Sequence, residues 1–573
     1  MILQVAYGSE TGCAEDVATN LHRRLKYYLD PDVESRVCSL NDYQFVFPSV
    51  AIIVCSTCGQ GDPPLNAKSF WKSIMSRSCP QDLFSDVEYS LLGLGDSAYT
   101  KFNFVAKKLF RRIQMLRGKS IFDLQLADEQ HEHGSDFQSE IFIADCLKAL
   151  STRFNFQLES PTIPLELPLP CTIKLKYLPT TNEDNAAAEI SWKHCCPYKG
   201  SLDSVARVTS EDHFQKTILA RISFESSKKS ESMKPGDVLA IQPVNPISCF
   251  NLFCELFPQI SMASKIMIAD ISDQWISIEY LITNVLDLIS IPRRSFFEVM
   301  SKLSNDEDER EKLMEIFTDQ ELFYSYCCRP RRSILEVFRD FPKTTSSLSL
   351  ERIIEYVPRI KERNFSMASV ITKQGTDSSF VELLVAVVKF QTKIQQPRLG
   401  LCSNFLADSE IPQKVMIDFR KGSFSLPQNQ ETPLIMIGPG TGVAPFRSVV
   451  QHRNGRKCFL FFGCRHPEKD FYFKEEWRTN FPDLKVFPAF SRYLTDKVCY
   501  VQHKLIEEKQ LVWKLISNED AFVYLAGSSK QMPKDVKEVL VEIIADLSET
   551  SLEEAKLYLE GMEKSRKFQE ETW

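Results

Sequence analysis

The sequence lacks several features that would place it in whole classes of protein. It has no run of about twenty apolar residues, which a membrane-spanning helix would need. Its first residues, MILQVAYGSETG, contain neither a basic segment nor a signal cleavage site. Positive charge is not in excess, since 69 Lys+Arg face 76 Asp+Glu and the net charge is −7, which argues against a general nucleic-acid binder. These absences predict a soluble cytoplasmic protein.

The 17 cysteines have no regular spacing, which is typical of reduced thiols rather than of a disulfide framework. One pair, Cys55 and Cys58 in AIIVCSTCGQGDPP, has C-x-x-C spacing. A redox dithiol would place the second cysteine inside a helix, but Gly59, Gly61 and two prolines follow Cys58. A zinc site would need two more ligands, and no second C-x-x-C and no H-x-x-x-H is present. We favour the third interpretation, a pair that packs within a loop, and we predict no metal site.

The chain is long enough for three or four domains. Residues 1–150 alternate apolar strands with helices, as in a doubly wound parallel sheet. Residues 151–195 are rich in proline and polar residues and are predicted to be a linker. Residues 196–430 show the alternation of an antiparallel β-barrel, interrupted at about 250–345 by a helical insert. Residues 431–573 return to an α/β pattern.

Three strands in residues 1–150 each lead into a loop rich in glycine and small polar residues. Backbone N–H groups and hydroxyls of the first loop, at a helix start, would form a phosphate cradle, although it is neither a P-loop nor a G-x-G-x-x-G turn. Such loops meet at one edge of a doubly wound sheet and bind its ligand there. The candidate residues are Ser9, Glu10, Thr11, Gly12, Cys13, Ala14, Ser56, Thr57, Cys58, Gly59, Leu94, Gly95, Asp96, Ser97, Ala98, Tyr99, Thr100, Lys101, Phe102 and Asn103.

These three loops, in this order, resemble those of the flavodoxin family across nearly all of residues 1–150. The resemblance implies FMN, with its phosphate in the first loop and its ring between the second and third loops. It implies that Tyr99 covers one face of the ring, whereas Cys58 stands where microsomal-type reductases usually have tyrosine. Asp128 and Glu129, in LADEQHEHG, would lie near the ribityl chain and the ring edge.

Residues 196–430 contain two segments with a resemblance to FAD domains of the ferredoxin–NADP reductase type. KERNFSMAS resembles their R-x-Y-S signature, with Phe365 in place of tyrosine, and PRLGLCSNFLA resembles their pyrophosphate turn. Arg331, in RPRRSILEVF, matches a family arginine that contacts FAD; a surface arginine in a basic cluster is the alternative. The implied FAD residues are Arg331, Arg363, Asn364, Phe365, Ser366, Gly400, Leu401, Cys402 and Ser403.

The last segment opens with PLIMIGPGTGVAPFRSVV, an apolar strand, a glycine-rich loop and a helix. With FLFFGCR, PAFSR and YLAGSSKQMPKDV it resembles the NADP-binding half of the same reductases. A 2′-phosphate calls for an arginine fork and a lysine, so the resemblance implies NADPH rather than NADH; a solvated basic loop is the alternative. The implied residues are Thr441, Ser491, Arg492, Lys497, Tyr500, Gln502 and Asp535.

The C-terminus, ETW, resembles the acidic-x-aromatic end of these reductases. By that resemblance Trp573 stacks on the FAD ring and moves aside for nicotinamide. Ser366 would then form a hydrogen bond near the flavin N5, and Glu571 would orient the hydride donor. Ser366, Glu571 and Trp573 are therefore the candidate catalytic residues. Ala526 stands where most relatives have a cysteine beside the nicotinamide, which predicts slow turnover.

Taken whole, the chain resembles the diflavin reductases, the family of cytochrome P450 reductase, and within it the cytosolic NADPH-dependent branch. The resemblance implies a path from NADPH to FAD, to FMN and then to the Fe–S protein anamorsin in cytosolic iron–sulfur cluster assembly. A soluble P450-reductase-type or methionine-synthase-reductase-type enzyme is the first alternative. A non-catalytic flavoprotein scaffold is the second, and the readable FMN, FAD and NADPH signatures argue against it.

Overall fold

The computed structural model describes residues 2–59, 61–99, 101–158, 169, 171, 173–178, 196–268, 275–375, 377–394, 396–453, 455–493 and 498–573. Two candidate residues, Thr100 and Lys497, lie outside the described residues. The chain forms two compact units. The first comprises Met1–Lys176, Asn251–Ser261 and Leu288–Pro358, and the second Tyr177–Phe250, Met262–Asp287 and Arg359–Trp573.

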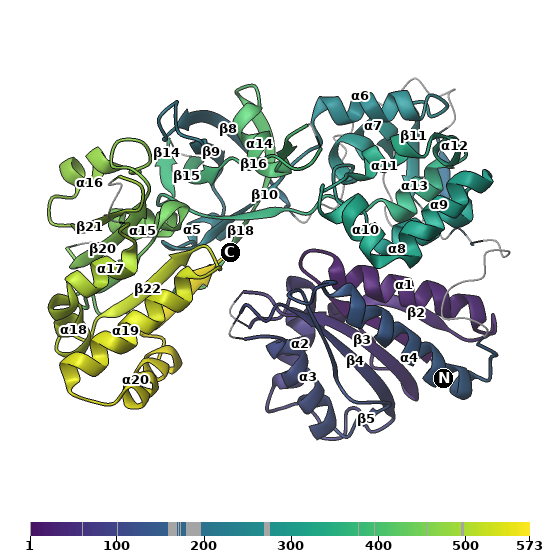
Figure 1. Cartoon of the computed structure of the whole chain (residues 1–573), viewed down its shortest axis with the longest axis horizontal. Helices are drawn as coiled ribbons and strands as arrows, with labels where there is room; N and C mark the ends of the chain where they lie inside the picture. Colours follow the sequence, from purple (N-terminus) through teal and green to yellow (C-terminus); the bar gives the residue numbers. More distant parts are fainter. Residues whose placement is uncertain are drawn as a thin grey trace. The chain divides into compact units, whose positions relative to one another are not determined.

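A parallel sheet covered by helices on both faces forms the N-terminal part of the first unit (Figure 1). Helices α1 (Cys13–Tyr28) and α4 (Asp136–Phe154) share one apolar cluster with the sheet. Helices α2 (Lys68–Met75) and α3 (Phe104–Met115) share another on the opposite face. The strands, in spatial order, are β2 (Ser35–Ser39), β1 (Ile2–Gly8), β3 (Ser49–Ser56), β4 (Val87–Gly95) and β5 (Lys119–Ser120), and β6 (Gln125–Asp128) also pairs with β4.

Helices make up most of the remainder of the first unit, and they pack against the sheet domain through buried charge. Arg24 of α1 is only 1% exposed, and it forms salt bridges with Glu140 of α4 (3.1 Å) and Glu298 of α8 (3.2 Å). The helices in this part of the first unit are α8 (Arg294–Leu303), α9 (Glu307–Thr318), α10 (Gln320–Phe323), η4 (Tyr324–Cys328), α11 (Ile334–Asp340), α12 (Pro342–Ser346) and α13 (Leu350–Tyr356), with most of α6 (Ile247–Leu256). The short elements β11 (Lys265–Ile268), β12 (Ile276–Ser277), α7 (Ile278–Tyr280) and η3 (Leu281–Val285) belong to the second unit, and β7 (Leu175–Tyr177) lies at the boundary in the chain.

An antiparallel seven-stranded sheet opens the second unit. A bridge between Met367, which follows the first strand of its path, and Leu383, in the last strand but one, closes the sheet as expected for a barrel. Helix α14 (Leu401–Asp408) packs its Cys402 and Leu406 into the barrel core. The strand order is β13 (Arg363–Ser366), β10 (Val238–Gln242), β18 (Gln413–Arg420), β8 (Tyr198–Arg207), β9 (Thr217–Glu225), β15 (Ser378–Ala386) and β14 (Thr372–Gln374), beside α5 (Lys228–Glu231) and the hairpin β16 (Lys389–Phe390) and β17 (Arg398–Leu399).

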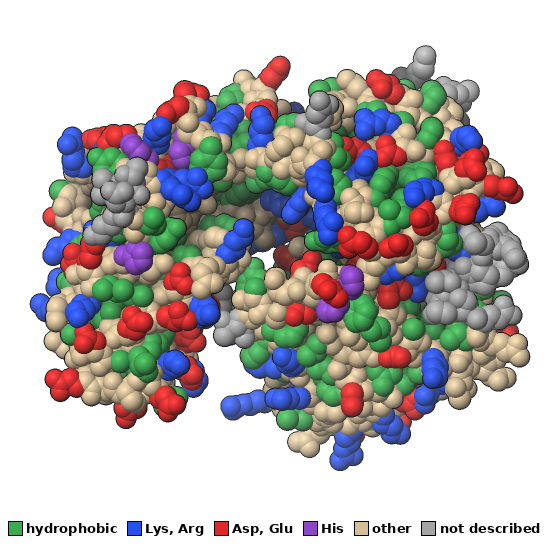
Figure 2. All heavy atoms as spheres, viewed as in Figure 1, with side chains coloured by type: hydrophobic (Ala, Val, Ile, Leu, Met, Phe, Trp, Pro, Cys, Tyr) green, Lys and Arg blue, Asp and Glu red, His purple; other side chains and the backbone are tan. Residues whose placement is uncertain are grey.

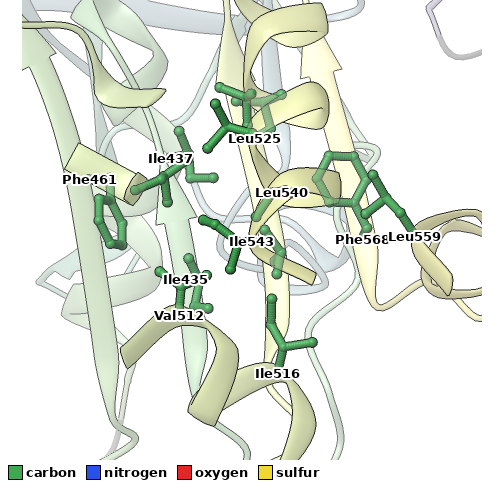
Figure 3. Close-up of a cluster of buried hydrophobic side chains, with 14 of the residues drawn as sticks. Ile435, Ile437, Phe461, Val512, Ile516, Leu525, Leu540, Ile543, Leu559 and Phe568 are labelled. Atoms are coloured by element: carbon green, nitrogen blue, oxygen red, sulfur yellow. The ribbon is translucent and has the colours of Figure 1, made fainter. Parts of the chain in front are cut away.

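A five-stranded parallel sheet completes the second unit. Its order is β21 (Lys485–Phe490), β20 (Cys458–Cys464), β19 (Leu434–Ile437), β22 (Phe522–Gly527) and β23 (Phe568–Thr572). Figure 3 shows one of its cores, in which Ile435 and Ile437 of β19 face Leu540 and Ile543 of α19. The helices are η5 (Gly440–Val443), α15 (Ala444–Gln451), α16 (Lys474–Asn480), α17 (Val501–Glu507), α18 (Lys509–Ser517), α19 (Met532–Ser548) and α20 (Leu552–Lys564).

This architecture confirms the predicted fold class. Along the chain, a parallel α/β domain comes first, an antiparallel barrel with its helices second, and another parallel α/β domain last. Within the part of the chain that the structure describes, no helix is both long enough and apolar enough to cross a bilayer.

Candidate active site

The first flavin loop, residues 9–14, joins β1 to α1 at the carboxyl edge of the parallel sheet. Ser9 is fixed on both sides, because its N–H donates to Asn66 Oδ1 (2.8 Å) and its Oγ accepts from the N–H of Gly12 (3.0 Å). Gly12 has φ 97°, and a Cβ there would meet no atom within 4 Å. The loop therefore curves around open space at the start of α1, where N–H groups lack intrahelical partners. This arrangement fits a phosphate.

The second loop is closed by reciprocal backbone hydrogen bonds between Cys58 and Asp62, of 2.9 and 2.8 Å. Cys55 lies in the preceding strand and is fully buried. Burial raises the pKa of the Cys58 thiol to about 12, and it also raises that of Cys55. A redox dithiol needs an accessible thiolate. Both thiols are protonated at neutral pH, and this argues against the dithiol.

The third loop is held from behind by two side chains. Asn103 is fully buried, and its Nδ2 donates to the carbonyl of Ala127 (3.0 Å). Asp128 Oδ1 accepts from the N–H of Ser97 (2.9 Å). Although burial acts to raise the pKa of Asp128, its hydrogen bonds outweigh that effect and leave the pKa below its usual value. Tyr99 is half-buried at the end of this loop.

The three loops come together, as the sequence predicts. Ser56 Oγ donates to the carbonyl of Gly8 (3.1 Å), and the N–H of Thr57 donates to the carbonyl of Leu94 (3.2 Å). Glu10 reaches from the first loop to the second and accepts from the N–H of Leu65 (3.1 Å). Glu129 joins them, since its N–H donates to the carbonyl of Gly95 (2.9 Å).

In the second unit, the start of α14 packs against Val388, in the segment that follows β15. Gly400 is the N-cap of α14, and a Cβ there would lie 2.7 Å from Val388 Cβ, so only glycine allows this approach. Ser403 Oγ accepts from the N–H of Val388 (3.0 Å) and fixes the turn. Burial raises the pKa of Cys402 to about 12, and the charge of the Arg363 guanidinium opposes that shift.

The remaining residues predicted to bind FAD lie in several elements. Asn364 accepts a hydrogen bond from Arg420 (2.9 Å), and Phe365 is half-buried against the barrel core. Leu401 begins α14. Arg331 belongs to the first compact unit, so it is not among the candidates that the second unit brings together. It has φ 51° and an exposed side chain.

Ser366 and Glu571 link the barrel to the last strand of the chain. Glu571 accepts hydrogen bonds from Ser366 Oγ (3.1 Å) and Ser423 Oγ (2.6 Å). Burial raises the pKa of Glu571, although both hydrogen bonds oppose the shift. Ala526 is fully buried and pairs with Glu571 across the two strands. A carboxyl group of raised pKa is thus held next to the position where the resemblance places nicotinamide.

Trp573 is 52% exposed, while its backbone is fixed by hydrogen bonds. Its N–H donates to the carbonyl of Gly527 (3.1 Å), and its carbonyl accepts from the N–H of Ser529 (3.0 Å). An anchored backbone with an exposed ring permits rotation of the side chain without movement of the chain. This fits an aromatic ring that covers a flat ligand and then leaves it.

The glycine-rich loop after β19 packs directly against β22. A Cβ on Gly442 would lie 2.1 Å from the carbonyl oxygen of Ala526, so the two backbones touch. Gly440 has φ 57° and no atom within 4 Å of its Cβ position. Thr441 lies between them, half-buried at the start of η5. The loop leaves open space above the sheet edge, as a nucleotide site requires.

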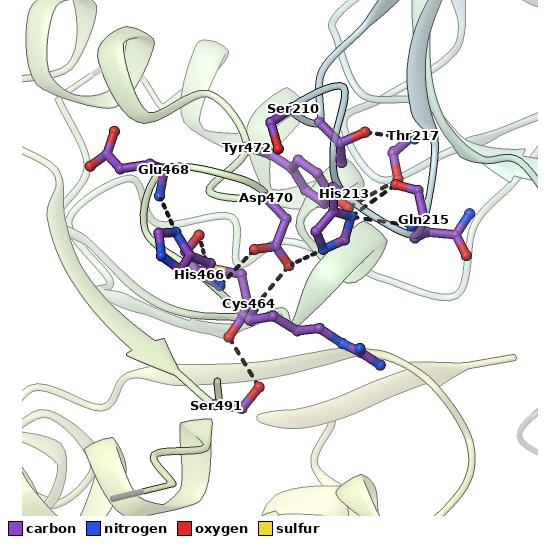
Figure 4. Close-up of polar contacts among 12 residues, drawn as sticks. Ser210, His213, Gln215, Thr217, Cys464, His466, Glu468, Asp470, Tyr472 and Ser491 are labelled. Carbon is purple, nitrogen blue, oxygen red and sulfur yellow. Dashed lines mark hydrogen bonds and ion pairs between the residues drawn. The ribbon is translucent and has the colours of Figure 1, made fainter. Parts of the chain in front are cut away.

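The loop that contains Ser491 and Arg492 is hydrogen-bonded to the end of β20 and the residue after it. The N–H of Ser491 donates to the carbonyl of Cys464 (3.0 Å), and that of Arg492 to the carbonyl of Arg465 (2.9 Å). Asp470 in turn accepts from the N–H of Arg465 (2.8 Å), as part of the polar network in Figure 4. The Arg492 side chain is exposed on this fixed backbone.

Three more candidates lie around α17. Tyr500 is the N-cap of this helix and is 46% exposed. Gln502 Nε2 donates to Asp535 Oδ2 (3.1 Å), and Gln531 Nε2 donates to Asp535 Oδ1 (2.8 Å). Asp535 is therefore held between two amides in the first turn of α19.

The sequence analysis missed two residues that position this site. Asn66 holds Ser9, and Ser423 holds Glu571. Neither lies in a motif with a recognisable pattern, so no signal in the sequence alone would have singled them out.

Comparison with known proteins identifies the family of each part of the chain. Family models match in chain order: Flavodoxin over residues 5–139, FAD binding domain over 192–405 and Oxidoreductase NAD-binding domain over 436–538. NADPH-dependent diflavin oxidoreductase 1 of Xenopus laevis is 38% identical over 100% of this chain and 99% of its own length. The proteins of that name from Mus musculus and Schizosaccharomyces pombe are 37% and 31% identical over the same shares. The chain belongs to the NADPH-dependent diflavin oxidoreductase 1 family.

As a member of this family, the protein is an NADPH-dependent oxidoreductase that carries electrons through FAD and FMN. The predicted family, enzyme class and three cofactors are thereby confirmed.

Proposed function

We propose that this diflavin oxidoreductase works in the cytoplasm and passes electrons from NADPH to a protein acceptor, an anamorsin-type Fe–S protein of cytosolic iron–sulfur cluster assembly. The observation that carries the proposal is the presence of three cofactor sites in one chain, each built from loops at a sheet edge or a helix start. The acceptor rests on the resemblance to the cytosolic branch of the diflavin reductases.

The chain's residues have distinct tasks in this proposal. When bound, the flavins supply the conversion of a two-electron hydride donor into single-electron steps. Residues 9–14 hold the FMN phosphate, and Tyr99 and Cys58 line the two sides of its ring. Residues 363–366 bind the flavin part of FAD. Residues 400–403 bind its pyrophosphate.

On the nucleotide side, Ser491, Arg492 and Tyr500 bind the 2′-phosphate, and Asp535, oriented by Gln502, lies toward the nicotinamide ribose. With FAD bound, the Trp573 ring would cover the flavin and would have to turn aside for nicotinamide. Ser366 and Glu571 then orient the hydride donor, with Glu571 held by the hydrogen bond from Ser423. Because burial raises the pKa of Glu571, this carboxyl group retains its proton to a higher pH than an exposed glutamate would.

An anaerobic NADPH titration of the purified protein, with the released flavins separated and counted, tests the relay. One FAD and one FMN per chain, both reduced by NADPH, is the expected result. FAD alone, or no bleaching, would mean that the Cys58 loop does not hold FMN or that the relay is broken, as in a scaffold.

The acceptor is tested separately, by mixing the NADPH-reduced protein with recombinant anamorsin and following the Fe–S absorbance. Catalytic reduction of anamorsin is expected. Reduction of cytochrome P450 or methionine synthase instead would contradict the proposed acceptor, but it would leave the proposed path from NADPH through FAD and FMN intact.

A further inference from the structure

The third flavin loop and α3 form a strongly basic segment on an otherwise acidic chain. Residues 97–122 contain no Asp or Glu, although the whole chain has a net charge of −7. The segment carries seven cations: Lys101, Lys107, Lys108, Arg111, Arg112, Arg117 and Lys119. Figure 2 shows basic side chains gathered over the part of the surface that α3 forms.

Four residues of α3 line up on its solvent face and are called the α3 stripe: Phe104, Lys108, Arg111 and Met115. Their spacing of four, three and four residues places them on one side of a helix. Lys108 Nζ lies 4.2 Å from the centre of the Phe104 ring, and Met115 is 70% exposed. Among the described residues, no carboxylate forms a salt bridge with Lys108 or Arg111. The stripe therefore offers cations flanked by apolar surface.

The α3 stripe begins at the flavin loops. The N–H of Val105 donates to Thr57 Oγ1 in the second loop (3.2 Å). A Cβ on Gly61 would lie 2.9 Å from Phe104 Cδ1 and 2.8 Å from Lys101 Cδ, so the second loop packs directly on the start of the stripe. A partner bound along the stripe would lie against the loops that we assign to FMN.

We propose that the α3 stripe is the docking surface for an acidic segment of the protein electron acceptor. Carboxylates of the partner would pair with Lys108 and Arg111, and apolar side chains between them would cover Phe104 and Met115. Because the rest of the chain is acidic, this stripe would also set the orientation in which such a partner arrives. The inference rests on the proposed transfer of electrons to a protein.

The test uses the full-length holoenzyme with charge reversal of the stripe, Lys108→Glu/Arg111→Glu. The matched control is Lys26→Glu/Lys148→Glu, which makes the same charge change at exposed residues of α1 and α4, on the opposite face of the sheet. The probes are a fluorescently labelled peptide of alternating glutamate and phenylalanine, and two haem proteins, acidic cytochrome b5 and basic cytochrome c.

At low ionic strength, the stripe variant should bind the acidic peptide about tenfold more weakly and show a kcat/KM for cytochrome b5 reduced about tenfold. Both differences should shrink in 0.5 M salt. Cytochrome c reduction should not fall, and ferricyanide reduction and the control variant should match wild type. Unchanged peptide binding and cytochrome b5 reduction in the stripe variant would overturn the proposal.

Other outcomes separate the inference from the proposed function. If neither haem protein is reduced while ferricyanide is, the transfer to proteins fails, and the peptide measurement alone decides whether the stripe binds acidic segments. If the variant loses binding to phosphatidylserine vesicles or to a DNA duplex but not to the peptide, the stripe serves another polyanion, and the proposal is wrong.

Discussion

Ser366 donates a hydrogen bond of 3.1 Å to Glu571, across 205 residues of sequence. This bond joins the first strand in the barrel's spatial order to the last strand of the NADP-binding sheet, and both residues were candidates for catalysis. Ser423 donates to the other carboxylate oxygen at 2.6 Å. The buried carboxyl group is thus bound by two hydroxyls of unequal predicted importance, which makes the pair of serines a useful comparison.

Replacement of Ser366 by alanine should slow hydride transfer from NADPH about tenfold, equivalent to about 1.4 kcal/mol in the barrier. The matched variant Ser423→Ala removes a hydroxyl from the same carboxylate but none from the assigned nicotinamide position, so it should slow the step less. Stopped-flow bleaching of FAD measures both. Equal rates in the two variants would remove Ser366 from the catalytic residues.

Glu571→Gln should change the pH dependence of stability. The folded chain holds the Glu571 proton more tightly than the unfolded chain does, because burial raises this pKa. The resulting stabilisation is complete below the ordinary pKa of 4.5 for this carboxyl group. It is lost as pH rises through the raised value, and each tenfold difference in proton affinity between the folded and unfolded chains contributes about 1.4 kcal/mol.

The glutamine variant cannot titrate, so its melting temperature relative to wild type should rise between pH 4.5 and 7.5. The exposed substitution Glu553→Gln on α20 serves as the control and should run parallel to wild type. Parallel curves for Glu571→Gln as well would show that its carboxyl group does not have a raised pKa.

The amount of structure that could be predicted from sequence depended on how local the signal was. β3 is an unbroken apolar run, and the loop after it contains Gly59, Gly61 and two prolines, so strand and loop follow from a few adjacent residues. The contacts of Asn66 with Ser9 and of Ser423 with Glu571 join residues 57 and 148 positions apart, with no pattern at either end.

Long-range burial was equally hidden from the sequence. Arg24 sits in an amphipathic helix next to Arg23, and nothing in that stretch distinguishes the side chain that is 1% exposed. Only the approach of α8, 274 residues later, makes it the buried partner of Glu298. The contact of Arg331 with FAD stays a prediction, because only the sequence motif supports it.

Arg492→Ala should raise the KM for NADPH by ten- to a hundredfold, because a hydrogen bond to a charged group contributes about 1.5–3 kcal/mol. The KM for NADH should change little, since NADH lacks the 2′-phosphate. Lys485→Ala, an exposed cation on the neighbouring strand β21, is the control. Steady-state ferricyanide reduction with each nucleotide measures the effect, and an equal rise for both nucleotides would contradict the assignment.

Trp573→Ala should relax the preference for NADPH over NADH. The substitution removes the exposed indole but retains the backbone hydrogen bonds to Gly527 and Ser529, so the last strand should stay in place. Without the indole, NADH, which binds more weakly than NADPH, no longer has to displace an aromatic ring from the flavin. Its kcat/KM should therefore rise about tenfold or more. An unchanged NADPH/NADH ratio would count against stacking on the flavin.

Cys58→Ser should leave NADPH-to-ferricyanide activity nearly intact, because the structure gives this thiol no redox role. Burial raises its pKa to about 12, so at pH 8 only about one molecule in ten thousand carries a thiolate there. Iodoacetamide should therefore label exposed Cys171 long before Cys58 in the native protein, and peptide mass spectrometry can follow the labelling.

The double variant Cys55→Ser/Cys58→Ser should retain ferricyanide activity as well, at some cost in stability because Cys55 is fully buried. Loss of ferricyanide reduction in the single variant, with flavin content unchanged, would restore the dithiol interpretation.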